Sequence, residues 1–395
     1  MKYDIAVIGA GPAGLMAAQA AGVSGKRVCV LERNREAGRK ICATGNGRCN
    51  ILNEKAPHAP ELKKALEDLG ILCAAEEDGR LYPRCREASF AARALVRADS
   101  HRADMLCGLR VTSVQKTEPG FVIESVRDEN GSPCETICAD RLIIACGGKA
   151  AIHMGCTGDG YRWASAWGHT VIRPIPALVG LCVQDDISSL AGTRLSCRVS
   201  MVCDGEEKGS RSGEVQFGKD YISGICVMDL SRFYRLSGGS RFSLHADCFP
   251  EYTKEQLQSL LERRLRDLGD PGSRGAVTAG GEPSRSEKYI SPLEGLVPAK
   301  LCAYAEGRAS AEGVSLWELM KDLSFTVCGT RGWKEAQVTS GGVSLSEICG
   351  DTFESRMVPG LYFAGEILDY DGPCGGYNLS NAWRTAVKCA GALCD

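Results

Sequence analysis

The stretch Ile5-Ala-Val-Ile-Gly-Ala-Gly-Pro-Ala-Gly14 decides the fold of the first part of the chain. A short apolar run, typical of a buried strand, leads into the pattern G-x-G-x-x-G formed by Gly9, Gly11 and Gly14. The segment from Ala13 to Ala21 is small, apolar and free of proline, and it predicts a helix that packs closely on a sheet. A strand, a glycine turn and a helix in this order predict a dinucleotide-binding Rossmann unit.

The next strand supplies an acidic residue for the same ligand. The run from Arg27 to Leu31 predicts this strand, and Glu32 ends it, eighteen residues beyond Gly14. In such a turn the glycines permit a tight bend, close approach of a pyrophosphate and close helix packing, while the helix N-terminus offers N–H groups to phosphates. A carboxylate at Glu32 accepts hydrogen bonds from ribose hydroxyls and disfavours a 2′-phosphate. These features predict a non-covalently bound dinucleotide whose ADP half lies on the glycine turn.

A second glycine-rich segment near the end of the chain favours FAD over NAD. The predicted strand from Gly360 to Ala364 is followed by Gly365 and Glu366, then by Gly375-Gly376-Tyr377-Asn378 and a terminal helix from about Leu379. A simple NAD dehydrogenase needs no such second loop. The flavin half of FAD extends away from the first loop and needs a second contact, where a helix N-terminus stabilises the anionic reduced flavin. Tyr377 is the candidate proton donor to substrate, with a role as a wall of the flavin site equally open.

Composition restricts the classes of partner. The chain has 395 residues, 47 basic and 49 acidic, and the near-neutral balance without a basic stripe argues against nucleic acid. The first four residues lead directly into an apolar run, and no uncharged stretch approaches the roughly 20 apolar residues of a membrane span. We therefore expect a cytoplasmic protein of two or three domains that acts on a small molecule. Its oligomeric state is left open.

The 21 cysteines contain no Cys-x-x-Cys pair, so we expect free thiols and no metal site. Cys42 and Cys49 are separated by six residues, which disfavours a redox-active pair. His153 and His169 belong to no recognisable acid–base constellation, and a structural role is favoured for both. No second G-x-G-x-x-G follows a later strand, so NADH or NADPH would bind transiently over the flavin, or oxygen or another acceptor would reoxidise it.

The middle of the chain differs from both ends in its sequence pattern. We expect a discontinuous FAD-binding domain at 1–175 and 338–395, a β-rich insert at 176–252 and a helical cap at 253–337. Short β-like runs support the insert, and capping boxes at Thr253 and Ser315 each predict the start of a helix. A polar segment from Gly269 to Ser286 interrupts the cap. The insert, roughly Pro176 to Gln337, is where the substrate is expected to be selected, although it carries no readable motif.

Four motifs resemble one bacterial family of FAD-dependent oxidoreductases, which includes aminoacetone oxidase and 3-dehydro-bile acid delta(4,6)-reductase. They are the stretch from Gly38 to Asn50, the turn Thr157-Gly-Asp-Gly-Tyr161, the segment Thr339-Ser-Gly-Gly-Val343 and the run from Gly360 to Asn378. The similarity spans nearly the whole chain in matching order. It implies an α/β, two-dinucleotide-binding-domain flavoprotein fold with an inserted β-barrel-like domain and a helical cap.

Residues and resemblance together give one expected FAD-binding set. Lys40 and Arg48 are its cations, able to offset phosphate charge or raise the flavin potential. The full set is Gly9, Gly11, Ala13, Gly14, Glu32, Arg33, Lys40, Thr44, Gly45, Asn46, Gly47, Arg48, Val111, Gly147, Gly365, Glu366, Gly376, Tyr377, Asn378 and Leu379.

Three functions remain open on the sequence. The first is NAD(P)H-dependent reduction of an activated C=C bond, for which the resemblance suggests a 3-oxo steroid such as a dehydro-bile acid. The second is a flavin oxidase of a small amino-ketone that uses oxygen. The third, disfavoured by the neutral charge, is a flavin-bearing binding or RNA-modifying module. The first two would share the FAD loops, so the sequence does not discriminate between them.

Overall fold

The chain divides into two compact units, each with its own buried hydrophobic core. The computed structural model describes residues 1–76, 78–99, 101–127, 130–134, 136–234, 240–269 and 291–394. The first unit comprises Met1–Ala177 and Trp333–Asp395, and the second comprises Leu178–Gly332. Apart from Gly269, the polar segment expected from Gly269 to Ser286 lies outside the described residues.

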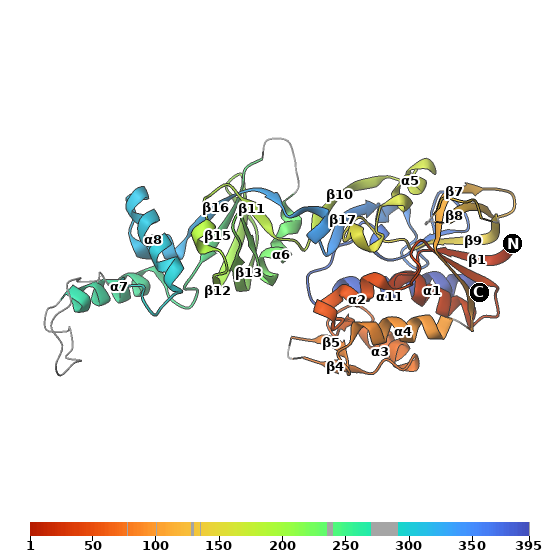
Figure 1. Ribbon diagram of the computed structural model, residues 1–395, viewed down its shortest axis with the longest axis horizontal. Coiled ribbons are helices and arrows are strands. Elements are labelled where there is room, and N and C mark those ends of the chain that lie inside the picture. Colours follow the sequence, from red (N-terminus) through yellow and green to blue (C-terminus); the bar gives the residue numbers. More distant parts are fainter. Residues whose placement is uncertain are drawn as a thin grey trace. The chain divides into compact units, whose positions relative to one another are not determined.

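The main sheet of the first unit has seven strands (Figure 1). Its order is β6-β2-β1-β9-β8-β7, and β18 also pairs with β9. Strands β6, β2, β1, β9 and β18 run parallel, whereas the pairs β7–β8 and β8–β9 are antiparallel. The bounds are β1 (Lys2–Ile8), β2 (Val28–Glu32), β6 (Ala103–Cys107), β7 (Leu109–Lys116), β8 (Phe121–Arg127), β9 (Ile137–Ile144) and β18 (Leu361–Phe363).

The parallel strands are apolar because they are covered on both faces. All five residues of β2 are buried, and so are the last four of β1. Helix α1 (Pro12–Gly22) buries its small residues and packs against α11 (Tyr377–Cys394) and α4 (Ala88–Asp99). Small side chains at this contact let helix and turn approach closely, so the glycine turn is held firmly above the carboxyl end of β1.

Two smaller sheets complete the first unit. Strands β3 (Leu52–Asn53), β5 (Arg80–Pro83) and β4 (Cys73–Ala75) form an antiparallel sheet, and β10 (Val171–Ala177) pairs antiparallel with β17 (Val338–Val343). Because β10 precedes the second unit in the chain and β17 follows it, this pairing joins the two segments of the first unit. The remaining helices of this region are α2 (Arg39–Ala43), α3 (Ala59–Asp68), α5 (Asp159–Ala166) and α10 (Gly332–Glu335).

The second unit contains a closed barrel in the order β11-β14-β13-β12-β15-β16. Its last strand, β16, lies within the range expected to form the helical cap, where apolar and polar positions alternate and pair with β11 and β15. The strands are β11 (Leu181–Val183), β12 (Arg194–Cys203), β13 (Glu206–Phe217), β14 (Tyr221–Ser223), β15 (Phe242–Asp247) and β16 (Leu323–Thr330). The helices are α6 (Ile225–Leu230), α7 (Lys254–Gly269), α8 (Ala299–Glu312) and α9 (Leu316–Lys321).

Both capping boxes expected from the sequence are formed in the second unit. The Thr253 hydroxyl accepts from the Gln256 backbone N–H, while the Gln256 side chain accepts from the Thr253 N–H. Ser315 and Glu318 make the same reciprocal pair before α9. Each box satisfies donors that a helix N-terminus otherwise leaves unpaired.

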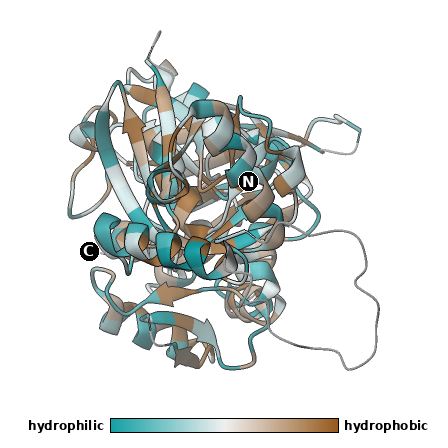
Figure 2. Ribbon diagram, turned by 90° about the vertical axis from the view of Figure 1, so that its left-hand side faces the viewer, coloured by the Kyte–Doolittle hydropathy of each residue, from teal (hydrophilic) through white to brown (hydrophobic). Residues whose placement is uncertain are grey.

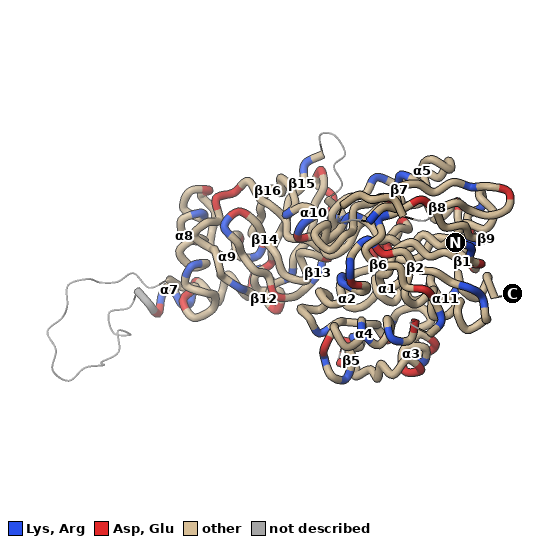
Figure 3. Tube along the Cα trace, turned by 45° about the vertical axis from the view of Figure 1, so that its right-hand side comes forward, with Lys and Arg blue, Asp and Glu red and all other residues tan. Residues whose placement is uncertain are grey.

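Hydrophobic and charged residues are distributed differently along the described chain. Hydrophobic residues concentrate along strands and inner helix faces (Figure 2), and Lys and Arg are interspersed with Asp and Glu along the described trace (Figure 3). Within the described residues, no helix combines the length and apolar character needed to cross a membrane.

Candidate cofactor site

The glycine turn leaves the N-terminus of α1 open toward a pocket. Gly9 has a φ of 103°, and a Cβ there would lie 2.6 Å from the carbonyl oxygen of Ala145. A Cβ on Gly14 would lie 1.8 Å from the carbonyl oxygen of Gly9, so helix and turn are in direct contact. At Gly11, by contrast, a Cβ would meet nothing within 4 Å, and no side chain caps the helix. The turn thus suits an anion that approaches the first N–H groups of α1.

Glu32 is fixed at the end of β2 by backbone and side-chain donors. Its Oε2 accepts from the Ala10 N–H at 2.9 Å, and its Oε1 accepts from the backbone N–H and side-chain amide of Asn34 at 2.8 and 2.6 Å. The residue is buried. A carboxylate offers about four acceptor positions, so capacity remains for ribose hydroxyls.

Asn34 connects this carboxylate to a guanidinium that the sequence reading missed. The Asn34 Oδ1 accepts from Arg39 Nη1 at 2.7 Å, and the Asn34 amide also donates to the Met154 carbonyl at 3.2 Å. Arg39 is exposed and borders the pocket from α2. Its position beside Lys40 in the basic pair Arg39-Lys40 was the available sequence signal. The chain Glu32–Asn34–Arg39 holds a cation beside the glycine turn.

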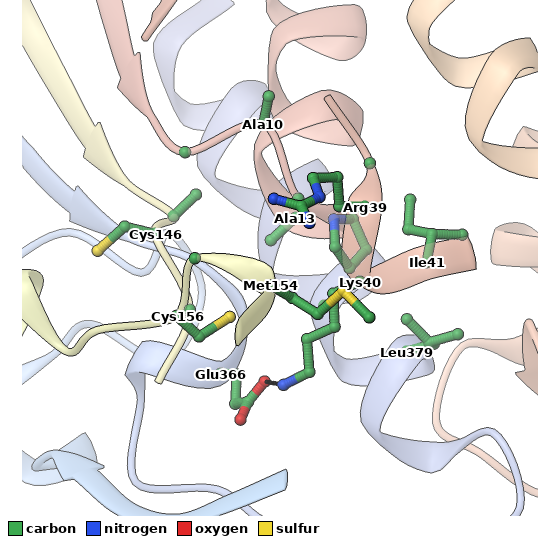
Figure 4. A pocket seen from close by; sticks show the side chains of 18 of the residues that line it. Ala10, Ala13, Arg39, Lys40, Ile41, Cys146, Met154, Cys156, Glu366 and Leu379 are labelled. Carbon is green, nitrogen blue, oxygen red and sulfur yellow. Dashed lines mark hydrogen bonds and ion pairs between the residues drawn. The ribbon is translucent and has the colours of Figure 1, made fainter. Parts of the chain in front are cut away.

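Lys40 and Glu366 form an ion pair between α2 and the short turn after β18. Lys40 Nζ lies 2.5 Å from Glu366 Oε2, and Glu366 Oε1 accepts from the Thr339 N–H at 2.8 Å. In Figure 4 the two side chains point toward each other across the pocket. Burial acts to lower the pKa of the Lys40 ammonium, but the charge of Glu366 and the hydrogen bond to it raise the pKa overall. Lys40 therefore stays charged.

Two adjoining pockets form one continuous site over the carboxyl ends of β1, β2 and β9. They share Gly9, Glu32, Cys146 and Gly155. The larger pocket encloses about 990 Å³ counted out to open solvent. The smaller one lies beyond Glu32 and is bordered by apolar side chains that include Ile8, Leu31, Leu109 and Val111.

The structure brings together part of the residue set expected from the sequence. Those bordering one of the two pockets are Gly9, Gly11, Ala13, Glu32, Arg33, Lys40, Thr44, Val111, Gly147, Glu366, Asn378 and Leu379. Those bordering neither pocket are Gly14, Gly45, Asn46, Gly47, Arg48, Gly365, Gly376 and Tyr377. Residues that the sequence reading did not single out also border the larger pocket, among them Asn34, Arg39, Cys146, Met154, Cys156, Gln337, Tyr370 and Asn381.

The loop before α11 places a different tyrosine at the pocket. Tyr370 borders it, whereas Tyr377 does not. The Asn378 side chain closes the loop, because it accepts from the Gly372 N–H at 2.8 Å and donates to the Gly372 carbonyl at 2.9 Å. Tyr370 thus lies seven positions before Tyr377 in the chain, and of the two it is the one that borders the pocket.

The loop from Thr44 to Arg48 is a set of left-handed turns beside the small β3-β5-β4 sheet. Asn46 has a φ of 54°, an uncommon conformation for a residue other than glycine. The Arg48 guanidinium lies over the Tyr82 ring, 5.3 Å from its centroid. Of this loop only Thr44 reaches the pocket, among the residues that the structure describes.

The thiols and histidines singled out in the sequence, Cys42, Cys49, His153 and His169, border neither pocket. Cys42 is exposed, Cys49 is buried, and neither borders the pockets. Burial raises the pKa of the Cys49 thiol to about 11, which disfavours its thiolate.

His169 is buried, with its Nε2 2.8 Å from the Ser355 hydroxyl. In the described part of the chain, no group of three or more His, Cys, Asp or Glu side chains could hold a metal ion.

The whole arrangement suits an elongated dinucleotide. The smaller pocket, lined by apolar and charged residues, could take a flat base, and Glu32 could accept from a ribose. The α1 N-terminus and Arg39 could donate to a pyrophosphate, and the larger pocket extends to α11. The uncapped helix and the open side of Gly11 are what the ADP half of FAD requires.

Comparison with known proteins places these features in a family. The model of the HI0933-like protein Rossmann domain matches residues 3–62 and 58–392. The chain is 33% identical over 415 residues to the 3-dehydro-bile acid delta(4,6)-reductase of Clostridium scindens, with 99% of each chain covered. It is 28% identical to the ribosomal RNA dihydrouridine synthase of Escherichia coli, over 98% of this chain and 97% of that one. Among solved structures, the E. coli quinol fumarate reductase subunit FrdA shares the fold, with a TM-score of 0.52 and 13% identity over this whole chain and 70% of FrdA.

Proposed function

The chain belongs to the HI0933-like Rossmann-domain family and is an FAD-dependent oxidoreductase, and we propose that it reduces a C=C bond conjugated to a ketone. The proposed substrate is a 3-oxo steroid of the dehydro-bile-acid type, and the proposed hydride source is NADH or NADPH, which binds transiently.

The continuous site from the apolar base pocket to the N-terminus of α11 carries this proposal. NAD would need only the glycine turn for its pyrophosphate. This site continues past the Lys40–Glu366 pair to Tyr370 and Leu379. That extension gives room for a ribityl chain and a flavin ring beyond the pyrophosphate. The twelve expected residues that border the site support FAD as the ligand.

Relatives support the class of substrate. The Clostridium scindens protein is named for reduction at a steroid carrying a 3-oxo group, and it covers nearly the full length of both chains. The E. coli relative is named for forming dihydrouridine, in which a C=C bond next to a carbonyl has been reduced. Both names describe addition of two hydrogens to a polarised double bond. The steroid is the proposed choice because the match to the bile acid enzyme is the stronger of the two.

Side chains of the first unit have distinct tasks in this reaction. When bound, FAD would supply the hydride-transfer chemistry between the nicotinamide and the substrate. The α1 N-terminus and Arg39 bind the pyrophosphate, and Glu32 binds the adenosine ribose. The Lys40–Glu366 pair holds a fixed ammonium near the flavin end. We assign the protonation of the substrate carbon to the Tyr370 hydroxyl, since Tyr370 borders the pocket and Tyr377 does not.

An anaerobic absorption spectrum of the purified protein, recorded before and after addition of NADH or NADPH, tests the proposal. Oxidised-flavin bands that bleach with one nucleotide and return on addition of a 3-oxo-4,6-diene steroid are the expected result. Bands that bleach only with an amino-ketone would contradict the reductase assignment and indicate an oxidase. Return of the bands with a uridine-containing ribosomal RNA fragment, but with no steroid, would contradict the steroid assignment while keeping the C=C chemistry. A protein without flavin bands after incubation with FAD would overturn the proposal entirely.

A further inference from the structure

The second unit carries a serine, a histidine and an aspartate connected in a single hydrogen-bonded chain. The Ser243 Oγ lies 2.8 Å from His245 Nε2, and His245 Nδ1 lies 2.6 Å from Asp322 Oδ1. Ser243 and His245 are two residues apart on β15, so their side chains share one face of the strand. The intervening Leu244 is buried in the barrel core, which places the pair on the outer face. Asp322 directly follows α9.

Ser243, His245 and Asp322 are connected in the order of a nucleophile, its general base and the group that orients the base. With the ring proton on Nδ1, His245 donates to Asp322 and leaves Nε2 to accept the hydroxyl proton of Ser243. This connectivity recurs on unrelated folds and is recognised by geometry rather than by position in the sequence. We propose that Ser243 is a nucleophilic serine, outside the flavin site, which takes an acyl group from small activated esters.

The surroundings leave the cluster accessible and undisturbed. The His245 side chain is 30% exposed, that of Asp322 is 62% exposed and Ser243 is half-buried, so all three residues are open in part to solvent. The nearby acid on the same strand, Asp247, is bound by Lys321 at 2.6 Å and does not compete for the imidazole. Thr326 on β16 is paired with Ser243 in register, so its hydroxyl lies on the same face and can donate to the oxyanion that forms there.

The proposed reaction needs only the ester and water. Ser243 Oγ attacks the ester carbonyl carbon as its proton moves to His245 Nε2, and the bond to the leaving alcohol breaks as that proton is transferred to it. An acyl-serine and a free alcohol result. Water then attacks the acyl-serine as His245 takes its proton, and the acid is released as the bond to Ser243 Oγ breaks and that proton returns to Oγ. No atom changes oxidation state, so the flavin takes no part.

Acylation of the full-length, FAD-loaded protein by p-nitrophenyl acetate tests the inference. Release of p-nitrophenol is followed at 25 °C with peptide mass spectrometry of the acetylated product, and a fluorophosphonate probe reports the same serine irreversibly. Ser243→Ala should abolish labelling at this position. His245→Gln should slow it on the order of 100-fold, the usual contribution of a general base, and Asp322→Asn by about 10-fold.

A matched control separates this chemistry from general surface reactivity. Ser200 on β12 is paired with His245 in register, and Ser200→Ala should leave the rate of acylation unchanged. Circular dichroism of each variant checks the barrel, and nucleotide-dependent flavin bleaching should be unaffected in all of them. An unlabelled Ser243 in the parent protein, or equal labelling in the parent and His245→Gln, would overturn the proposal.

Discussion

The two units use buried space in opposite ways. In the first unit, an uncapped helix N-terminus, a fixed carboxylate and an ion pair all face a pocket. In the second, the six-stranded barrel fills its interior with its own side chains, among them Phe217, Leu244 and Phe325. Small barrels are generally filled in this way. The contrast teaches that polar groups facing a pocket mark the cofactor site, whereas the chemistry of the barrel lies on its outer face.

Replacing one helical glycine in each unit with alanine should give the largest difference between the units in FAD affinity. Gly14 in α1 touches the glycine turn, whereas Gly307 in α8 is exposed and would meet nothing within 4 Å as alanine. Gly14→Ala should displace the turn and weaken FAD binding by about 100-fold or more, since shifts near 1 Å have effects of that size. Gly307→Ala should leave binding unchanged and raise the free energy of unfolding by about 0.5–1 kcal/mol.

Fluorescence titration with FAD and chemical denaturation of both glycine variants measure these effects. Equal FAD affinity in Gly14→Ala and the parent would show that the contact between helix and turn is not needed for the cofactor.

The next largest expected difference between the units is the change in the free energy of unfolding when a buried acid is replaced. Asp99 at the end of α4 is fully buried, and neither of its carboxylate oxygens has a hydrogen-bond partner among the residues that the structure describes. Burial raises its pKa to about 8, against about 3.9 in an unfolded chain. Folding therefore takes up a proton between pH 4 and 8, and the contribution of Asp99 to stability falls as pH rises through that window. Asp99→Asn should remove this slope and raise the free energy of unfolding at pH 7 by roughly 2–4 kcal/mol.

Urea denaturation of the parent and Asp99→Asn at pH 5 and pH 8 checks the sign, since the gain should be larger at pH 8. Asp229 in the second unit is the control, because its Oδ2 lies 3.8 Å from Arg211 Nε, and Asp229→Asn should destabilise the protein. A gain from Asp99→Asn that is the same at both pH values would contradict protonation of this carboxyl.

Variants of Tyr370 and Tyr377 test whether the tyrosine that borders the pocket is the one that protonates the substrate. Tyr370→Phe should lower kcat for steroid reduction by about 30-fold, within the range for loss of a general acid, and change the pH profile of kcat. Tyr377→Phe should retain nearly full activity, because Tyr377 does not border the pocket. Stopped-flow oxidation of the reduced flavin by the substrate separates this step from cofactor binding. The reverse ranking of the two variants would return the role to Tyr377.

The fold class predicted from sequence is confirmed by the family match, and the reason lies in the density of local signals at the start of the chain. Between Ile5 and Glu32, every element is determined by nearby residues: an apolar strand, a glycine turn, a small-residue helix and a second strand. The closing strand of the barrel was harder to place. Its alternation of Leu323, Phe325 and Val327 was visible, but its pairing with β11 depends on residues about 140 positions earlier.

The candidate site shows the same limit at the level of side chains. Glu32 and Glu366 could be anticipated, since each follows a strand and a glycine pattern. Asn34 could not, because its role arises from hydrogen bonds that form only in the folded chain, and Arg39 had no signal beyond its place beside Lys40. The hydrogen bond between His245 and Asp322 joins residues 77 positions apart and has no local signature.

Two half-buried lysines, Lys40 and Lys321, allow the finest test of the contrast between the units. Lys40 in the first unit bonds one carboxylate, that of Glu366, whereas Lys321 in the second bonds the Asp247 carboxylate and the carbonyls of Phe249 and Tyr252. We expect Lys40→Met to weaken FAD binding by about 10-fold with little change in stability, the size of one charged hydrogen bond. Lys321→Met should lower the free energy of unfolding by about 1–2 kcal/mol and leave FAD affinity unchanged.

The reason for the difference is what each ammonium can still bind. Lys321 has three acceptors for its three N–H groups, so it is saturated by its own unit. Lys40 has donors to spare and faces the pocket, so its remaining hydrogen bonds are available to a ligand. Because removal of Lys40 also leaves the Glu366 charge without its counter-ion, the double variant Lys40→Met, Glu366→Gln should bind FAD better than Lys40→Met alone. If calorimetric titration finds the double variant weaker by the sum of the two single effects, the lysine and the glutamate act independently on the cofactor and the pair is not a unit.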